Sequence, residues 1–408
     1  MRVFAHEHRN MAQSKLKRTF ACANAQHASC FLRLSNRFSH VLFVWLDQAS
    51  QLLVRQDSTS LSNIMNSHRR LLDPVFRKPT LAEIYENLYP WASLNAFVKQ
   101  LKDTIAYKSE DNAFIALNKP FGVGIHTVHD NNYKKQNQDK LLSRLTGSPR
   151  YCLDDALQPL ADEFKSPQAY QVIRSIDRYM SGLVLISNDP EKYRPRIHNS
   201  LIASRAQKWP PFGFRAITSG YPIKSGPGRK LSEEVGMDLI EVDELGHYKE
   251  PIIVREPTAK HRSRFCKDKY SYQVELQVKK VDKGLASTLI EVFVSTNKYD
   301  FTRCYVSSKT AFILGDVRFS KRYREILGKK IQVPVFKSSH SYDDSYEPLS
   351  YKVRKTLGVR SNASIPLMLD HYCLRLANFF KPEKPLIIES PYVPAHFALT
   401  AERLFGDR

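Results

Sequence analysis

Short apolar runs separated by polar connections fill the chain from about residue 110 to its end. The run Leu183–Ile186 is continuous and rich in Val, Ile and Leu, which is typical of a strand buried on both faces. Residues 270–276 and 287–294 alternate apolar and polar side chains, as half-buried antiparallel strands do. Strands of this kind joined by polar connections predict an α+β domain.

The residues before this domain have the periodicity of helices. Apolar side chains recur at helical spacing between Pro90 and Leu101, which predicts an amphipathic helix. Thr80 and Glu83 stand at the spacing of a capping box, so a helix is expected to begin just after Thr80. We therefore divide this part of the chain into an accessory helical region, 47–108, and a main domain, 109–408.

The first 46 residues have the composition of a targeting segment. They contain seven Lys and Arg side chains, and Glu7 is their only acidic residue. Basic, Ser-containing and acid-poor sequences are typical of organelle transit peptides. The apolar run Val41–Leu46 is much shorter than the roughly 20 residues that cross a membrane. We expect residues 1–46 to be a mitochondrial transit segment and the protein to work in the matrix; a basic arm that touches RNA is the alternative.

The overall charge of the chain indicates a polyanionic binding partner. The chain has 62 Lys and Arg against 41 Asp and Glu, a formal net charge of +21. Such an excess is typical of proteins that bind polyanions, although mitochondrial proteins and solvated lysine-rich surfaces are also basic. The six cysteines are scattered without a C-x-x-C pair, which indicates reduced thiols and not a disulfide framework or zinc site.

One carboxylate has unusual surroundings. Asp177 lies between Arg174 and a Ser181–Gly182 turn, immediately before the predicted buried strand. A carboxylate rarely stays buried without a partner or a function. From these residues alone two roles remain open: Asp177 caps the turn by accepting backbone N–H bonds, or it carries chemistry.

Several segments, in order along the chain, resemble one enzyme family. Residues 113–126 include Asn118-Lys119-Pro120 and end at His126, and residues 174–186 place Asp177 before Ser-Gly and an apolar run. Together they resemble RluA-type RNA pseudouridine synthases, whose patterns are v-x-x-N-K-P-x-G-x-x-x-H and H-R-L-D-x-x-T-S-G-L-L-L-x-A. Weaker matches continue to about residue 400, at 214–222, 296–306, 315–316, 367–376 and 389–394.

The resemblance implies a fold and a catalytic pair. It implies the α+β pseudouridine synthase fold, with a central, mostly antiparallel sheet, flanking helices and an RNA-binding cleft. Asp177 would be the catalytic carboxylate, either as nucleophile or as base. Aligning Gly315-Asp316 with the family's G-D places Arg303 on the family arginine. We expect its guanidinium within hydrogen-bond distance of Asp177, because a carboxylate in a desolvated pocket needs a cation to stay ionised.

The resemblance also implies substrate contacts. Phe214 occupies the position of a family tyrosine, and its ring could stack on a uridine that has been flipped out of the RNA. We assign Arg174, Arg178 and Lys119 to substrate binding as well. Uridine isomerisation oxidises nothing and moves no phosphate, so neither a cofactor nor a metal is expected. We further expect no membrane partner and a monomer.

Departures from the family pattern leave two functions open. Ser175, Arg174 and Met180 replace the family's arginine, histidine and threonine around Asp177, while Asp300 and Tyr305 replace two histidines and Phe214 lacks a phenol oxygen. The first hypothesis is an active synthase acting on mitochondrial rRNA, tRNA or mRNA. The second is a weakened or inactive member that serves as an RNA-binding or ribosome-assembly factor.

Other enzyme classes fit the sequence less well. A metal-dependent nuclease or nucleotidyl transferase needs clustered acidic residues, and here the acids are dispersed. A phosphate-transfer enzyme needs a glycine-rich loop that leads into a helix, but Gly122-Val123-Gly124 lacks the further glycine and the Lys-Ser/Thr pair. Both classes are therefore disfavoured.

Overall fold

The computed structural model describes residues 80–126, 149–220, 222, 227–241, 249–254, 270–319, 321–326, 329–334 and 349–406. All of them belong to one compact unit, residues 79–408. The expected transit segment, 1–46, lies outside the described residues, so its nature stays a prediction.

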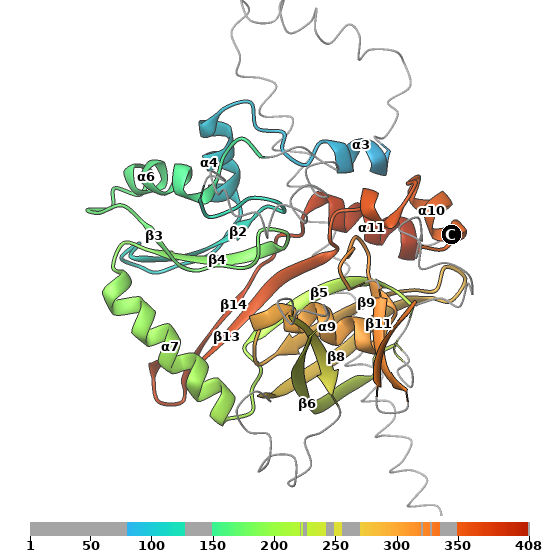
Figure 1. The fold of residues 1–408 in the computed structure, drawn as a ribbon. Coiled ribbons are helices and arrows are strands. Elements are labelled where there is room, and N and C mark those ends of the chain that lie inside the picture. Colours follow the sequence, from blue (N-terminus) through green and yellow to red (C-terminus); the bar gives the residue numbers. More distant parts are fainter. Residues whose placement is uncertain are drawn as a thin grey trace, which may run out of the picture. The chain divides into compact units, whose positions relative to one another are not determined.

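A 12-stranded mixed sheet forms the centre of this unit (Figure 1). Its main path runs in the order β1 (Ile105–Lys108), β2 (Phe114–Lys119), β4 (Ser181–Ser187), β13 (Leu369–Lys381), β5 (Phe212–Ser219), β9 (Ser287–Val294), β8 (Tyr270–Asp282), β6 (Lys230–Glu241) and β7 (Lys249–Val254). Three short strands pair beside this path: β3 (Gln171–Arg174) with β4, β10 (Phe312–Ile313) with β5, and β14 (Lys384–Glu389) with β13. A separate hairpin joins β11 (Lys321–Ile326) to β12 (Lys329–Pro334). Every described pairing is antiparallel except that of β4 with β13, which confirms the expected α+β class with a mostly antiparallel sheet.

Strands β2 and β4 are covered on both faces, as the continuous apolar run predicts. Ile115, Leu117, Val184 and Ile186 pack against α4 (Leu94–Asp103) and α6 (Leu153–Glu163) on one face. Phe114, Ala116, Leu183 and Leu185 face the other side, in one cluster with side chains of α7 (Pro190–Ala206). Side chains alternate between the faces of a strand, so a strand between two helical layers has to be apolar at successive positions.

The parallel contact between β4 and β13 depends on a glycine. Gly182 pairs with His371 and has a φ of 120°. A Cβ atom at this position would lie 2.2 Å from the carbonyl oxygen of His371, so only glycine permits this approach of the two strands. Next to it, the hydroxyl of Ser181 donates to buried Asp370 at 2.9 Å, and Arg215 donates to the same carboxylate. The strand that follows Asp177 is thereby fixed in the sheet.

The helical region before the sheet is integrated into the same unit. Helix α3 (Leu81–Glu86) begins with the predicted capping box between Thr80 and Glu83. Tyr85 hydrogen-bonds Thr400 of α11 (Ala395–Phe405) at 2.6 Å. The expected boundary at residue 108 falls between β1 and β2, which pair in one sheet.

The remaining described helices are short. They are the 3-10 turn η1 (Lys298–Asp300), α9 (Phe301–Lys309), α10 (Tyr351–Leu357) and the 3-10 turn η2 (Asn362–Ser364). None of the helices in the described part of the chain has the length and apolar character needed to cross a membrane.

Candidate active site

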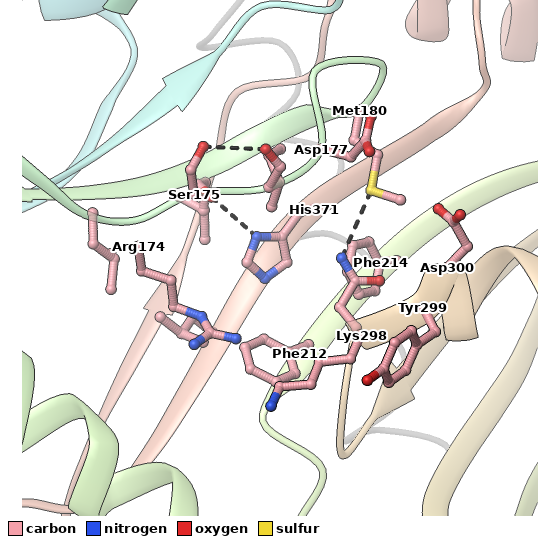
Figure 2. A pocket seen from close by; sticks show the side chains of 15 residues that line it. Arg174, Ser175, Asp177, Met180, Phe212, Phe214, Lys298, Tyr299, Asp300 and His371 are labelled. Carbon is pink, nitrogen blue, oxygen red and sulfur yellow. Dashed lines mark hydrogen bonds between the residues drawn. The ribbon is translucent and has the colours of Figure 1, made fainter. Parts of the chain in front are cut away.

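A pocket of about 410 Å³ lies against the sheet (Figure 2). Leu183 and Leu185, which belong to the same cluster as side chains of α7, are part of its lining. The walls of the pocket come from the loop between β3 and β4, from strands β4, β5 and β13, and from the turn between β9 and α9. Three of the predicted site residues, Arg174, Asp177 and Phe214, line it. Lys119, Arg178 and Arg303 do not.

Aromatic side chains form the inner part of the pocket. Phe212 and Phe214 of β5 are both buried, and Phe214 has 0% of its surface exposed. The ring of His371 lies 4.8 Å from that of Phe214, between centroids. Phe214 is therefore a packed wall of the pocket, with its ring covered by a neighbouring side chain.

Asp177 stands on the loop between β3 and β4 at the pocket wall. Its carboxylate Oδ1 accepts a hydrogen bond from the backbone N–H of Tyr179 at 2.9 Å, and its carbonyl accepts from Met180 N at 3.1 Å. The turn-capping role is thus present in the structure, and it is compatible with a chemical one because no described residue donates to Oδ2. The side chain is exposed, so the expectation of a desolvated carboxylate is wrong for the protein without RNA.

Arg303 does not pair with Asp177, which corrects the predicted hydrogen bond. Its Nε and Nη2 donate to the two oxygens of Asp316 at 2.9 and 2.8 Å, and its Nη1 donates to Asp300 at 3.2 Å. Asp316 is fully buried and lies only 13 residues further along the chain, and the guanidinium binds it in place of Asp177. Burial by itself lowers the pKa of Arg303, but Asp316, Asp300 and more weakly Asp177 raise it above its ordinary value.

Lys119 is buried beneath the Asp177 loop and not in the pocket. With 1% of its surface exposed, its ammonium donates to four carbonyl oxygens, those of Pro120, Val123, Arg178 and Met180. Burial lowers the pKa of Lys119 to about 7, while Asp177 raises it and Arg178 lowers it. A side chain with these partners holds the loop in place, and this position does not suit the direct substrate contact that the sequence suggested.

Arg178 also holds the loop that carries Asp177 in place. Its Nε donates to the carbonyl of Gly122 at 2.8 Å, and the N–H of Gly122 donates back to the carbonyl of Arg178 at 2.9 Å. Like Lys119, it connects the Lys-Pro turn after β2 to the loop that carries Asp177. The structure therefore places both basic residues where they position Asp177, and not on the pocket wall.

Arg174 is the one predicted basic site residue that lines the pocket. Its guanidinium stands over the ring of Phe212, 4.5 Å from the centroid, and forms no hydrogen bond with any described residue. Burial and the nearby charge of Arg205 lower its pKa to about 10, so it remains charged at neutral pH. A charged planar donor with unused N–H groups can bind a phosphate or the polar edge of a base.

His371 contributes an uncharged ring to the pocket. Its Nδ1 lies 3.1 Å from the carbonyl oxygen of Leu183, which can only accept, so the proton sits on Nδ1. Its Nε2 is buried and has no hydrogen-bond partner among the residues that the structure describes. Burial lowers the pKa of His371 to about 4, and the histidine is neutral at physiological pH.

The turn between β9 and α9 was not predicted as part of the site. Asn297, Lys298, Tyr299 and Asp300 all line the pocket. Tyr299 and Asp300 both have left-handed backbone, with φ of 53° and 55°, which costs about 1–3 kcal/mol per non-glycine residue. In the sequence this segment stood out through Arg303 and through Asp300, which replaces a family histidine. The residue types of the turn do not predict positive φ values at a tyrosine and an aspartate.

The described residues contain no group of three His, Cys, Asp or Glu side chains that could hold a metal ion. The polar groups that line the pocket can instead bind an anion, accept a proton and contact a flat apolar surface. Such a site suits the chemistry of a nucleoside within a charged polymer.

Two solved human structures are similar to this chain. The first, human RNA pseudouridylate synthase domain containing 4, is 18% identical, covers 76% of this chain and 96% of its own, and has a TM-score of 0.49. The second, human RNA pseudouridylate synthase domain containing 1, is 13% identical over 72% of this chain and 86% of its own, with a TM-score of 0.38. No family profile matches the chain, and no curated protein sequence matches it. Similarity at this level does not decide the function, which has to be inferred from the chain's own residues.

Proposed function

We propose that this protein is an RNA pseudouridine synthase of the RluA type that isomerises uridine in mitochondrial rRNA, tRNA or mRNA. The observation that carries the proposal is the meeting of Asp177, Arg174 and Phe214 in one pocket (Figure 2). Phe214 comes from a different motif than the other two, and the sequence resemblance by itself assigns all three to the site.

The reaction requires one carboxylate and a place for a detached base. The N1–C1′ bond of uridine breaks, the base turns, and C5 joins C1′. Asp177 would act on the nucleoside as nucleophile or as base. Lys119 and Arg303 are buried near Asp177 and sense its charge, but neither donates a hydrogen bond to its oxygens. The carboxylate is therefore free to react.

RNA would complete the site. A target uridine has to leave its stack at a cost of a few kcal/mol, which contacts in the pocket must offset. Arg174 offers unused N–H donors for a phosphate or a base edge, and the net charge of +21 attracts the RNA backbone over a longer range. Binding of RNA over the exposed Asp177 would remove water from the carboxylate.

The test is the nearly isosteric change Asp177→Asn. The amide oxygen can still accept the bond from Tyr179 N, so fold and RNA affinity should persist while the anion is lost. Pseudouridine should be mapped in total RNA, organellar RNA included, from cells with each version, with the exposed α6 variant Asp162→Asn as matched control. At least one site should vanish in Asp177→Asn and remain in the control. Identical maps for wild type and Asp177→Asn would reject turnover.

One observation favours the second candidate, an RNA-binding or ribosome-assembly factor without turnover. Phe214 has no phenol oxygen that could relay a proton, and its ring is fully buried. If the maps are identical while RNA binding persists, the binding function is the better account. The variant Phe214→Tyr then asks whether the missing hydroxyl is the cause, since it should restore at least one site.

The mitochondrial location is a separate part of the proposal. It is supported by the basic, acid-poor composition of residues 1–46. A fusion of these residues to a fluorescent reporter should accumulate in mitochondria. A diffuse signal would argue against a matrix enzyme and leave the proposed reaction untouched.

A further inference from the structure

Tyr299 is an exposed aromatic side chain in the wall of the candidate active site. It has 54% of its surface exposed, whereas Phe212 and Phe214 in the same pocket have 2% and 0%. It forms no hydrogen bond and no ring contact with any described residue. An exposed tyrosine of this kind lacks the packing contacts that usually stabilise an aromatic ring.

Phe214 is poorly placed to receive a base. Its ring is covered by His371 at a centroid distance of 4.8 Å, with an angle of 32° between the ring planes. His371 is itself held through Nδ1 by the carbonyl of Leu183 and pairs with Gly182 across the parallel strands. Presenting the face of Phe214 to a ligand would require β5 and β13 to repack.

The backbone holds Tyr299 at the pocket against its own preference. Both Tyr299 and Asp300 adopt left-handed conformations, which persist in non-glycine residues only when the surroundings enforce them. Here the enforcing contacts are those of Asp300, whose carboxylate accepts from Arg303 at 3.2 Å and from Arg318 at 2.6 Å. The ion pairs that anchor Asp300 thereby fix the residue before it.

We infer that Tyr299 is the side chain that stacks on the flipped uracil, in the role that the sequence resemblance had given to Phe214. The inference rests on the proposed function and names its base-binding residue. Stacking on an aromatic ring suits a flipped base because every base has a flat π face. Figure 2 shows Tyr299 and Arg174 on different sides of the pocket, so a base on the ring leaves Arg174 free for the polar edge or a phosphate.

The first experiment measures turnover. A synthetic RNA is used that spans a uridine modified by wild type and not by Asp177→Asn, and single-turnover rates are compared at subsaturating enzyme. Tyr299→Ala should lower the rate roughly tenfold, the lower range of one base–aromatic stack. Tyr299→Phe should keep the wild-type rate, because it keeps the ring. Tyr351→Ala, which removes a tyrosine with 69% exposure on α10, is the matched control and should have no effect.

Two outcomes of this experiment would overturn the inference. Either Tyr299→Ala is as fast as wild type, or Tyr299→Phe is as slow as Tyr299→Ala. In the second case the hydroxyl, and not the stacking surface, is what the reaction uses.

The second experiment does not depend on turnover. In Tyr299→Trp, uridine 5′-monophosphate should quench the added indole emission, because a stacked base quenches an indole, while ribose 5-phosphate should not. The chain's own three tryptophans are subtracted with the wild-type protein, and Tyr351→Trp is the control. Absence of quenching, or equal quenching by both ligands, overturns the inference. Quenching by the nucleotide in a protein without turnover upholds the base contact while rejecting the proposed reaction.

Discussion

Arg303 and Asp316 form a buried bidentate ion pair, with N···O distances of 2.9 and 2.8 Å. Asp316 is fully buried, and its Oδ1 also accepts from the backbone N–H groups of Arg318 and Phe319 at 3.0 Å. The arginine therefore organises the chain around the turn that carries Tyr299 and Asp300. It acts on the pocket through this turn and not through direct contact with Asp177.

This pair predicts a large effect on stability. Arg303→Ala would leave Asp316 buried without its cation, and breaking a buried pair costs about 3–5 kcal/mol of unfolding free energy. Arg318→Ala removes a more exposed partner of Asp300 and should cost about 1 kcal/mol or less. Urea unfolding of both variants measures the difference. Equal losses of unfolding free energy would show that the Arg303–Asp316 pair contributes no more to stability than the Arg318–Asp300 pair.

Gly182 should be irreplaceable at the contact between β4 and β13. In Gly182→Ala the new methyl group would meet the His371 backbone at 2.2 Å, so the strands must separate and the Asp177 loop must move. We expect a loss of about 4 kcal/mol or more, in the range of severe single substitutions. Gly228→Ala is the control, because Gly228 also has positive φ, but an added Cβ there has no atom of a described residue within 4 Å. Thermal unfolding that affects both variants alike would contradict the steric explanation.

Arg174 should contribute to RNA affinity through its charge and its planar donors. Arg174→Ala should weaken binding of a uridine oligonucleotide and reduce the slope of log K against log salt by roughly 0.7, the value for one single-strand phosphate contact. Arg174→Lys should restore most of the slope, but it should not restore the full affinity because the guanidinium fork is lost. Lys355→Ala on α10 serves as the control for removing an exposed charge elsewhere. An unchanged slope in Arg174→Ala would remove Arg174 from the RNA contact.

Buried histidines predict a loss of stability in acid. Burial lowers the pKa of His396 from 6.5 to about 4. Between these values the unfolded chain binds a proton that the folded chain does not, so stability falls as pH drops from about 6.5 to about 4 and then levels off. The shift from 6.5 to about 4 corresponds to roughly 3 kcal/mol. His371 acts in the same direction.

The pH effect can be assigned with two variants. His396→Leu should flatten the fall in unfolding free energy between pH 6.5 and pH 4, because the apolar side chain cannot bind a proton. His198→Leu changes an exposed histidine on α7 and should leave the profile as it is in wild type. Parallel profiles for wild type and His396→Leu would mean that other groups cause the acid sensitivity.

Local sequence patterns determined several elements of this protein. The capping box of Thr80 and Glu83, the doubly buried run Leu183–Ile186 and the alternation of residues 287–294 all appear in the structure as predicted. Each depends on side chains that are neighbours along the chain or on the fixed periods of helices and strands. The grouping of Asp177 with Phe214 in one pocket was also predicted, through motifs that a family keeps in order.

Only the tertiary structure decided which charged groups pair and which aromatic ring in the pocket is exposed. Arg303 could have reached several carboxylates, and the closeness of Asp316 and Asp300 settled its partners. Lys119 is buried and connects two loops, because its ammonium donates to four carbonyl oxygens that come from both of them. Tyr299 faces the pocket because ion pairs hold Asp300 in a backbone conformation that neither residue prefers. Ion-pair choice and backbone strain depend on distances between segments far apart in sequence, and the order of residues does not contain those distances.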